Sequence, residues 1–122
     1  MQPNYLYTAT ITNVVDGDTV DALVDLGFSM FSKIRFRLYG VDTPEKNDKD
    51  LVVRALGIAA SDYLRQTLLN KSITIQSVEK DKYGRWLAKI YITSDQPSIN
   101  EQLISLGYAK AYFGDNKQNL NW

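Results

Sequence analysis

The sequence has 122 residues, 44% of them hydrophobic and 23% charged, which are ordinary values for one globular domain spanning residues 1–122. It contains no cysteine and no histidine, which excludes disulfides, thiolate nucleophiles and Ser-His or Cys-His mechanisms, and removes the commonest zinc ligand. The 14 basic residues balance the 14 acidic residues, so the net charge does not indicate a polyanionic partner, and any catalysis must rely on carboxylates, Arg, Lys and Tyr.

Three segments in the first part of the chain alternate apolar and polar residues, as half-buried strands do. The first is Tyr5–Val15, where Tyr, Ala and Ile alternate with Thr. The second is Thr19–Leu26, with Val, Ala, Val and Leu on one face. A loop over residues 27–32 leads to the third, Lys33–Val41. We therefore expect a three-stranded meander.

Apolar residues at helical spacing predict an amphipathic helix from about Leu51 to Leu69. Two further strands follow, Ser72–Val78 and Trp86–Thr93, and a second helix is predicted after Ser98, which forms a capping-box pattern with Glu101. The helix faces expected to be buried are formed by Val52, Leu56, Ala59, Ala60, Tyr63, Leu64, Leu68, Ile99, Leu103, Ile104 and Leu106.

This order of elements predicts an α+β fold that is mainly β. Three consecutive strands, a helix, a closing hairpin and a second helix match a five-stranded Greek-key barrel of the OB type. The polar tail 114–122 receives no assignment, which leaves open whether the fold has two helices or a third one at its end.

The acidic residues of the N-terminal segment are a first candidate for function. Residues 1–32 contain four aspartates and no Lys or Arg, and two of the aspartates form the motif Asp16-Gly17-Asp18. An acidic segment beside a basic remainder suits a metal site next to a phosphate site. Asp and Gly are also turn formers, so a tight bend between strands explains this motif equally well.

The segment from Arg37 to Glu45 is more informative. The strand that carries Arg37 ends in Asp42-Thr43-Pro44-Glu45. Because Pro44 favours an extended conformation at Thr43 and lacks an N–H, the Thr43 carbonyl is available to face a cation. Carboxylate and carbonyl oxygens suit hard Ca²⁺ or Mg²⁺ rather than zinc. The alternative is a structural Arg–Asp pair beside a turn.

A third group of polar residues lies between the last two strands. Residues 81–85 read Asp-Lys-Tyr-Gly-Arg, a pattern typical of a polar hairpin turn with glycine at a positive φ. In a functional reading, the same turn brings a guanidinium, an ammonium and a phenol to one rim of the barrel.

Taken in order, these motifs resemble the staphylococcal nuclease (thermonuclease) family. The resemblance runs from about residue 7 to residue 112 and rests on four groups: Asp-Gly-Asp-Thr at 16–19, Arg-x-x-Gly-Val-Asp-Thr-Pro-Glu at 37–45, Asp-Lys-Tyr-Gly-Arg-x-Leu-Ala at 81–88, and Asn100 with Leu103, Ile104 and residues 107–110. Each group alone is modest, whereas four at fitting intervals are specific.

The resemblance implies an OB-fold, Ca²⁺-dependent phosphodiesterase that cleaves DNA and RNA and leaves 3′-phosphate and 5′-hydroxyl ends. Mg²⁺ or another hard divalent cation is the alternative cofactor. The metal ligands that it implies are Asp18, Asp42 and the carbonyl of Thr43.

The resemblance also assigns catalysis and substrate binding. Glu45 corresponds to the residue that orients or deprotonates the attacking water, and Arg37 and Arg85 correspond to the arginines that hold the scissile phosphate. The nucleotide-binding edge corresponds to Lys82, Tyr83 and an aromatic residue at Tyr112 or Phe113. These side chains suit the reaction, because a cation and two guanidiniums stabilise the negative charge that develops at phosphorus.

A catalytically weak or inactive OB-fold module that binds nucleic acid or a protein partner is the competing hypothesis. The neutral charge favours it slightly, because secreted members of the family are usually strongly basic. DNA or RNA is the expected partner, with no membrane association and a monomeric state. The first residues lack the pattern of a signal peptide, so we expect a cytoplasmic protein, with a mature secreted form as the alternative.

Overall fold

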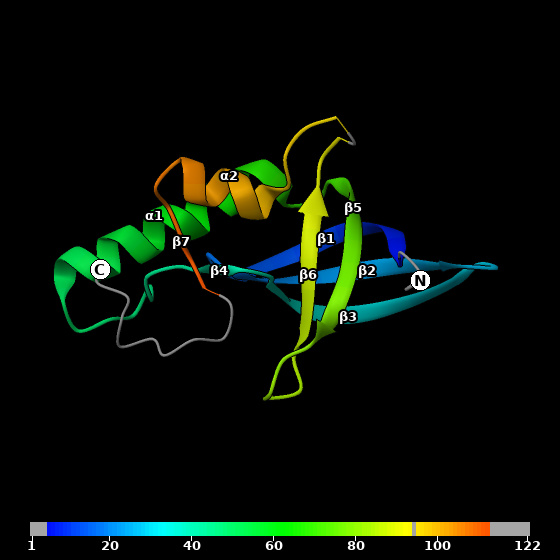
Figure 1. The fold of residues 1–122 in the computed structure, drawn as a ribbon, viewed down its shortest axis with the longest axis horizontal. Helices are drawn as coiled ribbons and strands as arrows, with labels where there is room; N and C mark the ends of the chain where they lie inside the picture. Colours follow the sequence, from blue (N-terminus) through cyan, green and yellow to red (C-terminus); the bar gives the residue numbers. More distant parts are fainter. Residues whose placement is uncertain (1–4, 94, 113–122) are drawn as a thin grey trace.

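A computed structural model describes residues 5–93 and 95–112, which form a small barrel with two helices packed at one end (Figure 1). The elements in chain order are β1 (Leu6–Asp16), β2 (Thr19–Gly27), β3 (Met30–Leu38), β4 (Val41–Asp42), α1 (Leu51–Leu68), β5 (Ser72–Lys80), β6 (Trp86–Tyr91), α2 (Ile99–Ser105) and β7 (Lys110–Ala111).

Five strands close the barrel in the order β1-β2-β3-β6-β5. Neighbouring strands are antiparallel, except that β3 and β6 run parallel and join through residues 36–38 and 86–88. β1 pairs with both β2 and β5, and register shifts between Ile11 and Asn13 and between Val14 and Asp16 let this long strand bend around the barrel. The closed five-stranded barrel confirms the predicted α+β, mainly β fold of the OB type.

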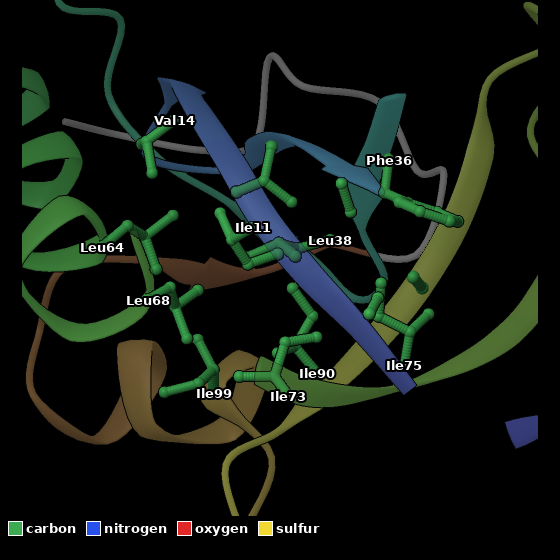
Figure 2. Packing of buried hydrophobic residues seen from close by; sticks show 14 of the residues in the cluster. Ile11, Val14, Phe36, Leu38, Leu64, Leu68, Ile73, Ile75, Ile90 and Ile99 are labelled. Carbon is green, nitrogen blue, oxygen red and sulfur yellow. The ribbon is translucent and has the colours of Figure 1, made fainter. Parts of the chain in front are cut away.

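The hydrophobic core fills the barrel and extends to both helices. Figure 2 shows Ile11 of β1 near the middle of this cluster, with Leu64 and Leu68 of α1 on one side and Ile99 of α2 below. These four side chains are completely buried. The helices therefore seal the barrel at the end opposite the β5–β6 turn.

Parts of the predicted helix faces were wrong. Val52 and Leu56 were expected to be buried but are 70% and 44% exposed, and Ala59 is exposed as well, because only the C-terminal part of α1 packs on the barrel. Ile104 and Leu106 are likewise exposed, at 38% and 57%. In α2 it is Ile99 and Leu103 that enter the core, and Ser98 caps the helix as predicted by accepting a hydrogen bond from the Glu101 N–H.

Two features of the strands were not predicted. β3 begins at Met30 rather than Lys33, because a tight turn at Phe28 and Ser29, both at positive φ, replaces the expected longer loop. A second sheet of two short strands pairs β4 with β7, joining Asp42 to Lys110. This small sheet brings the segment after α2 beside the end of β3.

Among the described residues, neither helix is long and apolar enough to cross a membrane. α1 and α2 are the two helices of this part of the chain, and a third helix in residues 114–122 would lie outside it.

Candidate active site

An acidic cavity lies where the β1–β2 turn, the end of β3 and the segment after β4 meet. Its volume is about 360 Å³. The charged residues that line it are Asp16, Asp18, Arg37, Asp42, Glu45, Lys46 and Arg85. Thr43 and Pro44 complete one wall. The motifs at 16–19 and 37–45 and Arg85 are thus brought together, although they are far apart in the sequence.

Arg37 occupies the centre of this arrangement. Its Nη2 lies 3.3 Å from Asp42 Oδ1 and 3.6 Å from Asp18 Oδ2, while Nη1 donates to the Val41 carbonyl at 3.0 Å. The Arg37 side chain is only 6% exposed. The two carboxylates and the carbonyl hold the buried Arg37 guanidinium in one orientation. Its positive charge is therefore already positioned at the cavity.

Asp18 is oriented by groups on both sides of the cavity. The Thr19 hydroxyl donates to Asp18 Oδ1 at 3.1 Å, and the Thr43 N–H donates to Oδ2 at 3.4 Å. The second contact ties the β1–β2 turn to the loop that carries Pro44 and Glu45. Asp18 and Asp42 therefore flank Arg37 as a preorganised pair, and Thr43 lies beside them.

Negative charge accumulates next to this pair. Burial, and secondarily the negative charge of Asp18, raise the pKa of the Asp16 carboxyl above its usual value. Lys46 and Arg35 act in the opposite direction and reduce this rise in the pKa of Asp16. The described residues contain no cluster of three or more acidic, Cys or His side chains able to hold a metal. A cation here would therefore use two carboxylates, a backbone carbonyl and water, a hard-oxygen set.

Glu45 and Arg85 line the cavity from two different segments of the chain. Glu45 is solvent-exposed on the loop after β4, where its carboxylate is accessible to water. Arg85 projects from the β5–β6 turn and is held by Asp81, whose Oδ2 lies 2.7 Å from Arg85 Nε. The two side chains therefore line the same cavity although they come from segments far apart in the sequence.

Asp81 organises the β5–β6 turn. Its Oδ1 accepts hydrogen bonds from the backbone N–H groups of Tyr83 and Arg85, both at 2.9 Å. Although partial burial acts to raise the pKa of Asp81, the hydrogen bonds from these backbone groups and from the Arg85 guanidinium lower it overall. The lowered pKa favours the ionised form of Asp81. Gly84 takes the positive φ of 81° that the turn requires. Sequence reasoning treated Asp81 only as a turn residue.

A second cavity, of about 280 Å³, adjoins the first. Arg37 and Arg85 line both cavities. The rest of the second cavity's lining includes three tyrosines, Tyr39, Tyr83 and Tyr112, together with Leu87, two lysines, Lys80 and Lys82, and two acidic residues, Glu79 and Asp81. With the two arginines, four basic residues face two acidic ones, and we call this the basic aromatic cavity. The predicted substrate-binding residues Lys82, Tyr83 and Tyr112 are therefore together at one place.

Tyr112 reaches this cavity through the β4–β7 sheet. Its N–H donates to the Gly40 carbonyl at 2.9 Å, and its ring centroid lies 5.5 Å from the guanidinium carbon of Arg37. Tyr83 is 72% exposed and lies near Lys82 and Arg85. The alternative Phe113 lies outside the described residues.

All nine residues predicted for the site line one or both of the joined cavities. Those of the acidic cavity are Asp18, Arg37, Asp42, Thr43, Glu45 and Arg85. Their individual roles stay predictions. Sequence reasoning missed Tyr39, Lys80 and Leu87 as lining residues. For Tyr39 the sequence did contain an indication, because it follows Arg37 by two residues and such residues lie on the same face of a strand.

The fold and the site together define an OB-type barrel in which a carboxylate–guanidinium cavity and a basic aromatic cavity share two arginines. Residues 35–121 match the family described as "Staphylococcal nuclease homologue", and the chain belongs to the staphylococcal nuclease family.

Curated relatives extend the similarity to most of the chain. It is 34% identical to the thermonuclease of Staphylococcus hyicus over 108 residues, covering 87% of this chain and 60% of that protein. It is 36% identical to endonuclease YhcR of Bacillus subtilis over 115 residues, covering 88% of this chain and 9% of YhcR. An uncharacterized Methanocaldococcus jannaschii protein, MJ1439, is 31% identical, with 89% and 61% coverage. The chain therefore spans less than two thirds of each of these relatives.

Proposed function

We propose that this chain is a metal-dependent nuclease that hydrolyses phosphodiester bonds of DNA and RNA and leaves 3′-phosphate and 5′-hydroxyl ends. The observation that carries the proposal is the shared position of Arg37 and Arg85, which line both the acidic cavity and the basic aromatic cavity. A phosphodiester held by both arginines has an acidic, water-accessible site on one side. On the other side are aromatic and cationic groups suited to a nucleotide.

The cofactor that fits the donor set is a hard divalent cation, with Ca²⁺ preferred and Mg²⁺ as the alternative. Asp18, Asp42 and the Thr43 carbonyl would hold it, and when bound it would supply Lewis-acid stabilisation and lower the pKa of water. The charge balance is compatible with this assignment, because the four carboxylates of the acidic cavity outnumber its three cationic side chains, Arg37, Lys46 and Arg85, by one.

The chain's own residues account for the remaining steps. Glu45 orients a water molecule and accepts its proton as the water oxygen bonds to phosphorus. The bond from phosphorus to the 5′-oxygen breaks, and that oxygen takes up a proton to leave as a hydroxyl. Arg37 and Arg85 stabilise the negative charge on the equatorial oxygens through charge-assisted hydrogen bonds.

Substrate positioning falls to the second cavity. Tyr83 and Tyr112 provide aromatic faces for a sugar or base, and Lys82 provides a cation for a neighbouring phosphate. Since Tyr112 also lies against Arg37, nucleotide binding and phosphate binding would be coupled through one contact.

The test is a cleavage assay with labelled single- and double-stranded DNA and RNA, using tag-free protein and separate Ca²⁺, Mg²⁺ and Mn²⁺ arms. We expect cleavage with a divalent ion, its loss on chelation, and 3′-phosphate ends on the products. Arg37→Ala and Glu45→Ala should each lower the rate by about a thousandfold or more.

Matched controls come from residues of the same types elsewhere. Arg65→Ala removes an arginine paired with Asp62 on the surface of α1, and Glu101→Gln alters a carboxylate on α2. Both should retain activity. Intact nucleic acid in every metal arm, with binding preserved, would refute the enzyme and support the non-catalytic binding module instead.

A further inference from the structure

The last residue pair before the β5–β6 turn is a lysine opposite a tryptophan. Lys80 ends β5, Trp86 begins β6, and the two are register partners. Residues opposite each other in an antiparallel pair share a face, and the Lys80 ammonium lies 4.6 Å from the centroid of the Trp86 ring. The ring is only partly covered, since Trp86 is 41% exposed.

Packing accounts for part of the Trp86 ring but leaves the rest of it exposed. On its other side β6 pairs in parallel with β3, where Phe36 is the register partner of Trp86 and is 4% exposed. Trp86 therefore begins its strand beside a buried residue of β3, while its own side chain stays partly exposed. A tryptophan needed only to close this end would not require an exposed face with a cation above it.

The pair also adjoins the proposed active site. Trp86 directly follows Arg85, and Lys80 directly precedes Asp81, so both stand at the base of the turn that carries Lys82, Tyr83 and Arg85. Lys80 lines the basic aromatic cavity as well. Figure 1 shows this turn projecting from the barrel below β5 and β6. Because Lys80 both lines this cavity and lies over the Trp86 ring, it links the ring to the edge of the proposed substrate site.

We propose that Trp86 and Lys80 form an additional nucleotide subsite, in which the indole stacks on an unpaired base and the ammonium binds the adjoining phosphate. The chemistry is that of single-strand binding, where aromatic rings stack on bases and cations follow the backbone. In a duplex both faces of a base are covered by neighbouring bases, so this subsite selects single-stranded DNA or RNA. The inference relies on the proposed function for its substrate class and extends it by one subsite.

Tryptophan fluorescence tests this subsite without requiring cleavage. The chain has two tryptophans, Trp86 and Trp122, so Trp122→Phe makes Trp86 the sole indole fluorophore. Oligothymidylates of one to six nucleotides are titrated into this variant in the presence of a chelator. We expect the longer oligomers to quench Trp86, whereas the mononucleotide and a matched duplex leave its emission unchanged.

Substitutions then separate stacking from folding. Trp86→Ala should weaken hexanucleotide binding by about tenfold, as expected for one lost base stack, and leave mononucleotide affinity unchanged. Trp86→Phe keeps a stacking ring and should restore most of the affinity, which also covers the case that the alanine variant fails to fold. Tyr91→Ala, which removes an aromatic residue elsewhere on β6, should have no effect.

The outcomes for this subsite are distinct from those for catalysis. Length-dependent quenching without cleavage would support the subsite and refute the proposed nuclease activity. Cleavage with the same affinity for one and six nucleotides, or an unquenched Trp86, would overturn the subsite and leave the nuclease proposal standing. A Trp86→Ala variant that is folded and binds the hexanucleotide normally would also overturn it.

Discussion

Gly57 on α1 lies directly against the backbone of Glu45. A Cβ added at Gly57 would lie 2.6 Å from the Glu45 carbonyl carbon, 2.6 Å from the Pro44 carbonyl oxygen and 2.7 Å from the Lys46 nitrogen. All three are backbone atoms, which cannot rotate aside as a flexible side chain can. The helix thus forms the surface on which the loop with the proposed water-activating carboxylate rests.

Gly57→Ala should therefore disturb this loop. In an exposed helix, replacing glycine by alanine stabilises by about 1 kcal/mol, so a loss of stability here would itself reveal the close contact. We expect a kcat for the proposed cleavage that is lower by about ten- to a hundredfold, because a displacement of about 1 Å is enough to misplace a catalytic group. Nucleotide affinity, which depends on the second cavity, should change little.

A matched control separates this effect from helix propensity. Ala59 lies on the exposed face of the same helix, so Ala59→Gly lowers the helix propensity without a contact with the loop. It should lower stability and leave kcat unchanged. If Gly57→Ala is more stable and fully active, the helix does not position Glu45.

Asn100 joins α2 to the strands that carry the site. Its side-chain oxygen accepts from the Ile90 N–H at 3.1 Å, and its nitrogen donates to the carbonyls of Tyr39 at 2.8 Å and Ala88 at 3.0 Å. Asn100→Ala should lower the free energy of unfolding by about 2–4 kcal/mol, because the Ile90 N–H and the Tyr39 carbonyl lose this partner, whereas the Ala88 carbonyl still accepts from the Tyr39 N–H at 2.8 Å. Urea denaturation measures this. Gln102→Ala, which loses one exposed hydrogen bond to Pro97, should cost under about 1 kcal/mol.

The sequence predicts the features of the structure that have local causes better than those that depend on tertiary packing. Alternation predicted β1, β2 and β5 well, because each of these strands has one buried face along much of its length. The turn at 81–85 followed from local preferences of Asp and Gly. The strands β4 and β7 have two residues each, too few for any periodicity, and they exist because tertiary packing brings them together.

The same contrast between local pattern and tertiary packing explains which residues near the site are buried. Alternation places Arg35 and Arg37 on one face, yet Arg37 is buried and Arg35 is exposed, because Asp42 and the segment after β4 cover only the end of β3. Periodicity in α1 likewise identified an apolar stripe but not where the barrel stops covering it, so Val52 was wrongly expected to be buried. Motif spacing predicted residues that the fold brings together around the two cavities, whereas how deeply each is buried depends on tertiary packing.

Ser61 on α1 offers a route to higher stability. It is 2% exposed, and its hydroxyl has no hydrogen-bond partner among the residues that the structure describes. Ser61→Ala should raise the free energy of unfolding by about 1 kcal/mol, because it removes an unsatisfied buried polar group and favours the helix. Ser105→Ala, at an exposed position of α2, changes helix propensity alone and should therefore raise the free energy of unfolding by less than Ser61→Ala does. Equal gains in the two variants would show that the Ser61 hydroxyl carries no desolvation cost.

The pair Asp21–Arg35, which lines neither of the two cavities of the site, links stability to acid pH. Arg35 Nε lies 2.7 Å from Asp21 Oδ1 across β2 and β3, and this hydrogen-bonded guanidinium lowers the pKa of Asp21 in the folded protein. The unfolded chain, where the carboxyl pKa is about 3.9, then binds protons at a higher pH than the folded protein does. The stabilisation is thus complete above that value and is lost as the pH falls through the lower folded pKa.

Asp21→Asn should accordingly be less stable than the parent at neutral pH, and the difference should shrink as the pH falls below about 4. Urea unfolding at a series of pH values measures it, with Arg35→Ala and the double variant completing a cycle. The coupling should be modest, because the pair is exposed, and it should fall with added salt. A difference that stays constant from neutral to acidic pH would mean that Asp21 stabilises the strands through something other than its charge.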